Sequence, residues 1–426
     1  MCHDGSVGGT AMIRLLACVA AISTGCSTSA NIGTTSSGAP ELSTTTSLVL
    51  AADTRVTPAS LLDTADVCRI ADATDTHSAT NNAPSTSGFP RREMAAPTTS
   101  LRLLVMPVST PDIPYDVDDH AALVAAMPEF ERYFETVSYG RAAVTYDIAD
   151  FADHVVLDRT AQSYGLIPGD RAETWDFIRA AAREIPVRYD VGNYDIVAFD
   201  VGADPAANFW GTAVPMPDDP VRAESGEVRY ATLSGGWQPA SWRLIAHEVA
   251  HVWLGFEDLY NTEPNPNYDG TFWFWDLMNS YRGEAPELIA WHRFLAGWLD
   301  DEQIRCVSNA APTTSIHFLS PVQDSAATPK AIVRPLGNGA VLVVESRRKM
   351  GYDVAEPGVL VYAFDTSIPG GRGPVIARGE LTLDPARRPI VDRFVIPLGD
   401  KLTTDGVRVT LLASDESGDL IQFDVL

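Results

Sequence analysis

The stretch that most constrains this chain is the pattern His-Glu-x-x-His at positions 247–251, which Gly255 follows. Residues four apart lie on one face of an α-helix, so His247 and His251 can present imidazole nitrogens to a single point. Glu248, beside the first histidine, can reach a water held at that point. The pattern therefore predicts a helix that directs two ligands and one acid toward one ion.

The chemistry that suits this arrangement is that of a zinc hydrolase. Catalytic zinc takes three protein ligands and leaves its last position to a water, whose pKa it lowers toward neutrality. Glu248 would take the proton from that water. Gly255 supplies the left-handed residue that ends a helix, so the chain can double back with a third ligand.

The alternative is a solvated helix that contains histidine and glutamate by chance. The surrounding sequence argues against it, because apolar residues recur at core spacing from Pro239 onward, at Trp242, Ile245, Val249 and Val252. Leu244, His247 and His251 share a different stripe. A buried helix with two histidines on its other face favours a metal site.

Composition limits the partners. The chain has 426 residues, enough for two folded domains plus tails, and 45% of them are hydrophobic. A net charge of -25 argues against nucleic acid and anionic membrane surfaces as partners. Such acidity fits a soluble secreted protein, and it does not identify a substrate.

The first 26 residues resemble a bacterial export signal. Leu15–Ile22 is a short apolar run after Arg14, too short to span a bilayer but suited to a signal peptide. Gly25-Cys26 resembles a lipoprotein processing site, at which Cys26 would carry the lipid. A cleaved and released protein and an unprocessed start remain alternatives. We expect an exported bacterial protein, extracellular or at the cell surface, with membrane contact only through Cys26.

Residues 27–100 predict a flexible linker or a pro-segment. Ser27–Pro40 is rich in Ser, Thr, Gly and Ala and has no charged residue. Between Arg55 and Ser100, only 61–62 and 67–70 have the composition of ordered chain. Whether this region must be removed before the protein acts is left open.

The cysteines predict one disulfide. Cys2 and Cys18 would be lost with the signal, and Cys26 is the lipid candidate. Cys68 and Cys306 remain as a pair in an oxidising compartment, which favours a disulfide over two free thiols. A weaker alternative makes Cys68 a latency ligand to zinc.

Residues 101–305 predict an α/β catalytic domain. Apolar periodicity indicates strands and helices in alternation before the histidine-bearing helix. The strands are expected at 101–108, 144–148 and 194–201, and the helices at 128–137, 171–185 and 286–298. A site helix packed beneath such a sheet is where a substrate cleft would lie.

Residues 306–426 predict a small β-rich domain with no recognisable chemistry. Asn338-Gly339 before Ala340–Val344 is a hairpin signal. Further strands are expected at 359–364, 407–412 and 420–425.

Between the two regions lies the aromatic run Phe272–Trp275, which is expected to pack the floor of the site. Met278 follows, either in an apolar turn beneath the ligands or as an ordinary core residue. Tyr281 is a candidate to polarise the scissile carbonyl or to hold the oxyanion.

These residues resemble the immune inhibitor A family of secreted bacterial metallopeptidases over about residues 88–365. The likeness rests on the segments His247–His251, Gly255, Asp258–Tyr260, Met278, Ala290-Trp291, Leu295–Leu299, Ser138–Arg141, Val344–Arg347 and Pro357–Tyr362. The resemblance implies a zincin-type α+β catalytic domain. It also implies zinc-dependent cleavage of peptide bonds in extracellular proteins, often with calcium as a structural ion.

The chain departs from the family at the glycine, which usually stands three residues after the second histidine. Here Gly255 stands four after His251. Counting from the histidines makes Glu257 the third ligand, whereas counting from the glycine makes it Asp258. Asp258 is preferred, because the chain reverses at the glycine and the reach of the ligand is set from that turn. The predicted ligand set is therefore His247, His251 and Asp258.

Two other functions compete with this one. The pattern up to Gly255 also resembles zinc aminopeptidases, but these need a glutamate about eighteen residues further on, and there is none around 269–273. A surface binding protein on a decayed peptidase scaffold is the second alternative. The intact Glu248 speaks against it, since a lost enzyme has no need of a base.

Overall fold

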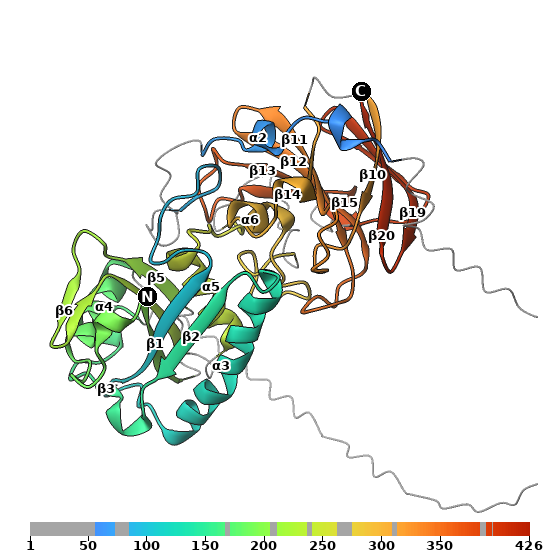
Figure 1. The fold of residues 1–426 in the computed structure, drawn as a ribbon. Helices are drawn as coiled ribbons and strands as arrows, with labels where there is room; N and C mark the ends of the chain where they lie inside the picture. The colour runs from blue at the N-terminus through green and yellow to red at the C-terminus, as the bar shows by residue number, and fades with distance from the viewer. Residues whose placement is uncertain are drawn as a thin grey trace, which may run out of the picture. The chain divides into compact units, whose positions relative to one another are not determined.

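The structure, a computed structural model, describes residues 56–72, 85–166, 171–204, 211–236, 241–261, 275–308, 313–383, 389–393 and 395–426. All of these belong to one compact unit, Thr46–Leu426. The predicted export signal, Cys26, Pro239 and the aromatic residues 272–274 lie outside the described residues. The fold is a mixture of α and β structure (Figure 1).

The first sheet has the strand order β2-β1-β4-β8-β5, and β3 also pairs with β1. Its strands are β1 (Ser100–Ser109), β2 (Ala143–Ile148), β3 (Val155–Val156), β4 (Ile196–Ala203), β5 (Gly211–Pro215) and β8 (Tyr230–Gly236). Strands β1, β2, β3, β4 and β8 run parallel, and β5 closes the edge antiparallel to β8. The expected strands at 101–108, 144–148 and 194–201 are β1, β2 and β4.

Helices cover both faces of this sheet, which explains why both faces of its central strands β1 and β4 are mostly apolar and buried. Helices α3 (Val117–Val137) and α5 (Trp242–Trp253) share a core with Leu103 and Val105 of β1. Helix α4 (Arg171–Arg183) packs on the other face, against Leu104 and Met106. The short strands β6 (Val221–Ala223) and β7 (Gly226–Val228) form a hairpin. The remaining 3-10 turns of this half are η2 (Phe151–Asp153), η3 (Gln162–Tyr164) and η4 (Val191–Asn193).

Helix α3 begins earlier than its apolar periodicity predicts. The expected start was Pro128, which instead lies inside the helix. The actual start is set by Asp116, whose side chain accepts hydrogen bonds from the amides of Asp118 and Asp119, while Asp119 bonds back to the Asp116 amide. This reciprocal capping box satisfies donors that the first helical turn leaves without partners.

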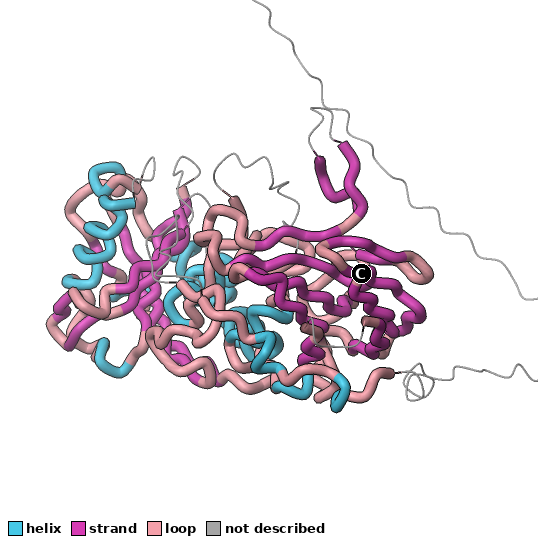
Figure 2. The backbone as a smooth tube through the Cα atoms, turned by 90° about the horizontal axis from the view of Figure 1, so that it is seen from above, coloured by secondary structure: helices cyan, strands magenta, loops and turns pink. Residues whose placement is uncertain are grey.

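From β9 onward the described residues form strands and turns (Figure 2). A six-stranded sheet contains β9 (Ile304–Cys306), β11 (Ala331–Gly337), β12 (Ala340–Arg347), β13 (Gly358–Asp365), β14 (Val375–Arg378) and β17 (Val395–Ile396). A four-stranded sheet contains β10 (Thr314–Leu319), β18 (Lys401–Thr404), β19 (Val407–Asp415) and β20 (Gly418–Val425). Strands β15 (Glu380–Leu383) and β16 (Pro389–Arg393) pair with each other.

The hydrophobic core is continuous between the helical half and the six-stranded sheet. Helix α6 (Ala290–Leu295) lies between them, and Leu360 and Tyr362 of β13 belong to the same buried cluster as Ile245 of α5. A second cluster joins the six-stranded sheet to the four-stranded one through Leu342, Val361 and their neighbours. Helix α6 is shorter than the predicted 286–298. No helix among the described residues is long and apolar enough to cross a membrane.

Part of the region predicted as a linker or pro-segment is folded. Turn η1 (Ala59–Leu61) and helix α2 (Ala65–Cys68) lie at the two places expected to be ordered, and η6 (Asp301–Gln303) packs beside α2. A disulfide joins Cys68 to Cys306, with 5.8 Å between their Cα atoms, which confirms the predicted pairing. Residues 85–87 are fully buried. At least 56–72 and 85–100 are thus part of the folded body.

Candidate metal centre

Helix α5 positions both histidines of the predicted site. Its apolar residues, among them Ile245, Val249 and Val252, are buried in the core. His247 and His251 lie one turn apart, with ring centroids 4.8 Å from each other, and both side chains are almost fully buried. Because its apolar residues anchor α5 in the core, the helix presents the two imidazoles on the same face.

Gly255 turns the chain back toward the histidines. Its φ of +73° lies in the left-handed region, which confirms the predicted conformation. The reversal brings the carbonyl oxygen of Phe256 to 2.7 Å from Nδ1 of His251. A side chain at Gly255 would also crowd Met94 and Thr86 of the N-terminal segment. The position therefore combines an unusual backbone conformation with close packing.

Asp258 is the carboxylate that meets the histidines. Its Oδ1 lies 3.1 Å from Nε2 of His247 and 3.2 Å from Nε2 of His251. The two Nε2 atoms are 3.3 Å apart. These three residues each offer one atom to a group that could hold a metal ion, and all three are buried.

Backbone contacts decide which ring nitrogens face the centre. Nδ1 of His247 is 3.0 Å from the carbonyl oxygen of Leu277, and Nδ1 of His251 bonds Phe256 in the same way. A carbonyl only accepts, so each Nδ1 carries a proton and each Nε2 faces the centre; in the neutral tautomer with this proton, the lone pair of Nε2 points inward. Two lone pairs and a carboxylate oxygen then face one another.

That arrangement fits a bound cation. Three acceptors at this spacing repel one another unless a positive charge lies between them. Tetrahedral zinc, with bonds of about 2.0–2.1 Å, separates neighbouring ligand atoms by about 3.3 Å. The distances between the three ligand atoms agree with that value. The residues present therefore suit a metal ion such as zinc.

The electrostatics of the three ligands point the same way. Burial alone would raise the pKa of Asp258, but the neighbouring His251 and His247 bring it well below its usual range. Burial would lower the pKa of His251, but the Asp258 carboxylate outweighs this and raises it. The carboxylate thus favours positive charge at the centre, whether a proton or a metal ion supplies it.

Glu248 is buried beside the ligands and is unusually hard to ionise. Burial raises its pKa to about 8, with His247 opposing the shift and Asp258 adding to it. The first residue of β5 packs against it, since a Cβ on Gly211 would lie 2.5 Å from Glu248 Oε1. A dication held by the adjacent histidines would bring the pKa of Glu248 down again.

Glu257, the alternative third ligand, contacts serine side chains, whereas Asp258 contacts the histidines. Its Oε1 accepts hydrogen bonds from the hydroxyls of Ser85 at 2.8 Å and Ser87 at 2.6 Å. Burial raises the pKa of Glu257 to about 7, and the two serines oppose that shift. Glu257 therefore ties the N-terminal segment to the loop that carries Asp258. Nothing in the sequence near Ser85 signals this contact.

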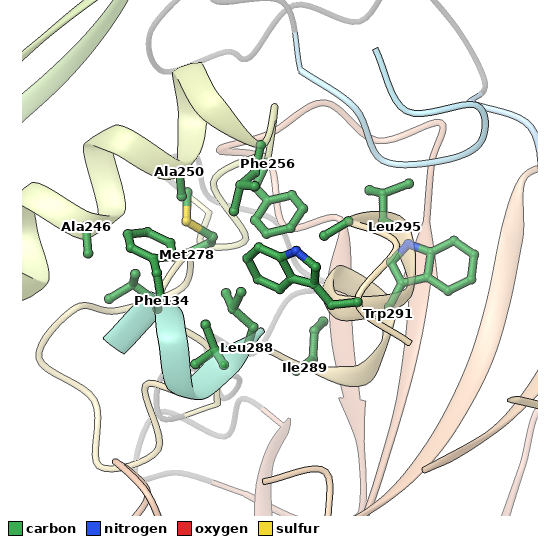
Figure 3. Close-up of a cluster of buried hydrophobic side chains, with 14 of the residues drawn as sticks. Phe134, Ala246, Ala250, Phe256, Met278, Leu288, Ile289, Trp291 and Leu295 are labelled. Atoms are coloured by element: carbon green, nitrogen blue, oxygen red, sulfur yellow. The ribbon is translucent and has the colours of Figure 1, made fainter. Parts of the chain in front are cut away.

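The other predicted site residues lie nearby. The ring of Tyr281 meets that of His247 edge-on, with 6.4 Å between centroids. Met278 is fully buried and lies among Ala250, Phe134 and Leu288 (Figure 3). Met278 is thus both a core residue and part of the turn beside the ligands. The region 262–274, where an aminopeptidase would carry its third ligand, lies entirely outside the described residues.

The comparisons with known proteins add little to this geometry. No family model matches the chain, and no curated protein matches it. Among solved structures, it is similar to metalloproteinase-II from Bacteroides fragilis, with 16% identity and a TM-score of 0.24 over 47% of this chain and 53% of that one. The chain thus spans about half of that protein. So low a TM-score supports no conclusion, and the resemblance to the immune inhibitor A family rests on the motif residues alone.

Proposed function

We propose that this protein is a zinc-dependent endopeptidase of the zincin type, related to the immune inhibitor A family, that is exported and cleaves peptide bonds in extracellular proteins. The observation that carries the proposal is the convergence of His247, His251 and Asp258. Their ligand atoms lie 3.1–3.3 Å apart. The Nδ1 atoms of both histidines are hydrogen-bonded to backbone carbonyls, which leaves Nε2 to bind a metal. Such a set of acceptors is suited to a metal ion.

His247, His251 and Asp258 would hold the zinc, with Glu248 beside them. When bound, zinc would polarise the scissile carbonyl and lower the pKa of a water. Glu248 Oε1 or Oε2 would accept the proton of the attacking water and later deliver it to the leaving amine. Glu248 follows the ligand His247 directly in helix α5 and is buried with it, so its carboxylate belongs to the same enclosed site.

The histidines and Tyr281 would have supporting tasks. The carbonyls of Leu277 and Phe256 keep both imidazoles in the tautomer that binds a metal through Nε2. Tyr281, whose ring contacts that of His247, would stabilise the oxyanion through its hydroxyl. Calcium and the lipid at Cys26 stay predictions without a described site.

The test combines metal analysis with hydrolysis of casein by the purified full chain. We expect about one zinc per chain, loss of hydrolysis with a chelator, and recovery when zinc is restored. Glu248→Ala should keep the zinc and lose hydrolysis. Chelator-resistant hydrolysis, or hydrolysis undiminished in Glu248→Ala, would refute the mechanism. A folded chain without zinc would instead support the non-catalytic binding protein.

A further inference from the structure

Asp276 is the most unusual buried residue outside the proposed ligand set. It is fully buried, and its φ is +110°, a conformation that residues with side chains rarely adopt. Backbone strain of this kind persists only where surrounding contacts hold it in place, and it gathers at functional sites. The contacts of Asp276 therefore indicate what the strain supports.

The Asp276 carboxylate joins a turn to the start of helix α6. Its Oδ1 accepts from the amide of Met278 at 2.7 Å. Its Oδ2 accepts from the amide of Ile289 at 2.8 Å and from Nδ1 of His292 at 2.9 Å. The backbone amide of Asp276 donates to the carbonyl of Ala285 at 2.9 Å. One side chain thus fixes both the turn 276–279 and the helix that follows.

The turn in its strained form supports two of the three ligands. The carbonyl of Leu277 accepts from Nδ1 of His247 at 3.0 Å. The next carbonyl, that of Met278, accepts from the amide of Leu259 at 3.0 Å, directly after Asp258. Two successive carbonyls of one turn therefore hold His247 and the segment that carries Asp258.

The third ligand is reached through His292. The His292 ring stacks on Phe256, with 4.2 Å between centroids and 9° between planes. The carbonyl of Phe256 in turn accepts from Nδ1 of His251 at 2.7 Å. Asp276 orients His292 through its Nδ1, so a second path runs from the same carboxylate to His251.

We propose that Asp276 is a positioning residue that sets the geometry and the affinity of the metal centre through these contacts to all three ligands. The proposal rests on the proposed zinc site. Neutral asparagine at this position would keep one acceptor oxygen but turn an NH₂ group toward backbone and imidazole donors. Outer partners of metal ligands typically account for about 10–100-fold in metal affinity.

Asp353 provides a matched control. It is a buried carboxylate of the same region, and it accepts from the amide of Glu287 at 3.0 Å and from Nη1 of Arg347 at 2.6 Å. None of its described hydrogen bonds goes to the segments 247–259 or 276–279. Replacing either aspartate with asparagine removes a buried negative charge, but only Asp276 is tied to the ligands.

The experiment compares zinc affinity in the full-length wild type, Asp276→Asn and Asp353→Asn, measured by competition with a chelating dye. Asp276→Asn should raise the zinc Kd about 10–100-fold and change the visible absorption of the cobalt-loaded protein. Asp353→Asn should lower the melting temperature but leave the Kd and the cobalt spectrum as in wild type. A folded Asp276→Asn with wild-type Kd and spectrum would overturn the proposal.

His292→Phe tests the same proposal if Asp276→Asn does not fold. Phenylalanine keeps the stack on Phe256 but removes the donor to Asp276, so the zinc Kd should rise several-fold and the cobalt spectrum should shift. Unchanged values there would overturn the proposal that Asp276 acts on all three ligands, because its path to His251 runs through His292. Failure of the proposed function has another signature, since wild type itself would then bind neither zinc nor cobalt.

Discussion

Two buried polar regions of this molecule, one at helix α5 and the other around Arg293 of helix α6, resolve their charges in opposite ways. In the first, His247, His251 and Asp258 turn three acceptor atoms toward one point. In the second, Arg293 and Arg347 lie among acids, and every carboxylate of the group meets a guanidinium. The acids are Glu287, Glu345 and Asp353, at 2.6 Å from their guanidinium partners.

In the second region, each charged side chain of the ion-pair network has an oppositely charged partner. Arg293 also donates to the carbonyls of Leu288 and Val137, both at 2.9 Å. Glu345 accepts from the amide of Ala290 at 2.7 Å, at the first residue of α6. A buried charge network whose members are all satisfied makes a rigid, specific core. At the candidate metal centre the facing atoms are instead all acceptors, which teaches that burial alone does not mark a site and that converging acceptors do.

The largest effect should come from removing the third ligand. Asp258→Asn is expected to weaken zinc binding by more than the about 10–100-fold typical of outer partners, because it removes a direct ligand. Glu257→Gln, an equally buried neighbour bonded to Ser85 and Ser87, should keep its zinc. Dialysis against buffered zinc followed by metal analysis decides the matter, and loss of zinc from Glu257→Gln alone would reverse the assignment.

The next effect tests the network. Arg347→Met should lower the free energy of unfolding by about 3–5 kcal/mol, because Glu345 and Asp353 would be left buried without their cation. Denaturant unfolding measures this loss. Any variant that still folds should bind zinc as wild type does, so a large change in zinc Kd would show that the two regions are not independent.

A smaller effect is expected at the edge strand. Gly211→Ala would place a methyl group against the Glu248 carboxylate, so that side chain must move. Hydrolysis should fall about 10–100-fold in kcat, part of the 10²–10⁴-fold that a general base contributes. Zinc content should not change. Thr212→Ala, the next residue of β5, is the control, and equal losses in both variants would contradict a specific effect on Glu248.

The smallest effect concerns Asp200, a buried acid that has neither a metal site nor a guanidinium partner among its described contacts and is instead held protonated. Burial raises the pKa of Asp200 to about 8, and the hydroxyl of Ser234 at 3.2 Å opposes the shift. The unfolded chain loses this proton near pH 4, so the folded state binds more protons between pH 4 and 8. Stability should therefore fall as pH rises through that window.

Asp200→Asn should remove this pH dependence and gain about 1–3 kcal/mol over wild type at pH 8, with little gain at pH 4. Melting temperatures of both proteins across the window give the comparison. A constant difference between them at all pH values would show that Asp200 is ionised in the folded protein.

The convergence of His247, His251 and Asp258 was predictable because its signals are local. Helical spacing places His247 and His251, and Gly255 dictates the reversal that brings Asp258 into reach. Strand β1 and the β-hairpin at Asn338 could also be predicted from the sequence. Both depend on local signals, an apolar run and a pair of turn residues, and not on contacts with distant parts of the chain. The disulfide between Cys68 and Cys306 could be predicted because these two cysteines are the pair that remains once those of the export signal are set aside.

The missed features depend on tertiary contacts or on weak local patterns. Strand β8 has small and polar residues that give no clear alternation, and β5 follows a segment without apolar periodicity. The start of α3 carried a signal, the acids at 116 and 119, that apolar spacing does not register. The links from Ser85 to Glu257 and from Asp276 to His292 join segments that only the folded chain brings together.

The bond between Ser87 and Glu257 limits where any maturation cut can fall. A protease that trimmed the chain beyond residue 87 would strip the hydroxyls that hold the loop next to Asp258. A cut between residues 72 and 85 would keep both serines in the protein. The N-terminal fragment would nevertheless stay covalently bound through the Cys68–Cys306 disulfide. Only a reductant, acting after such a cut, would set that fragment free.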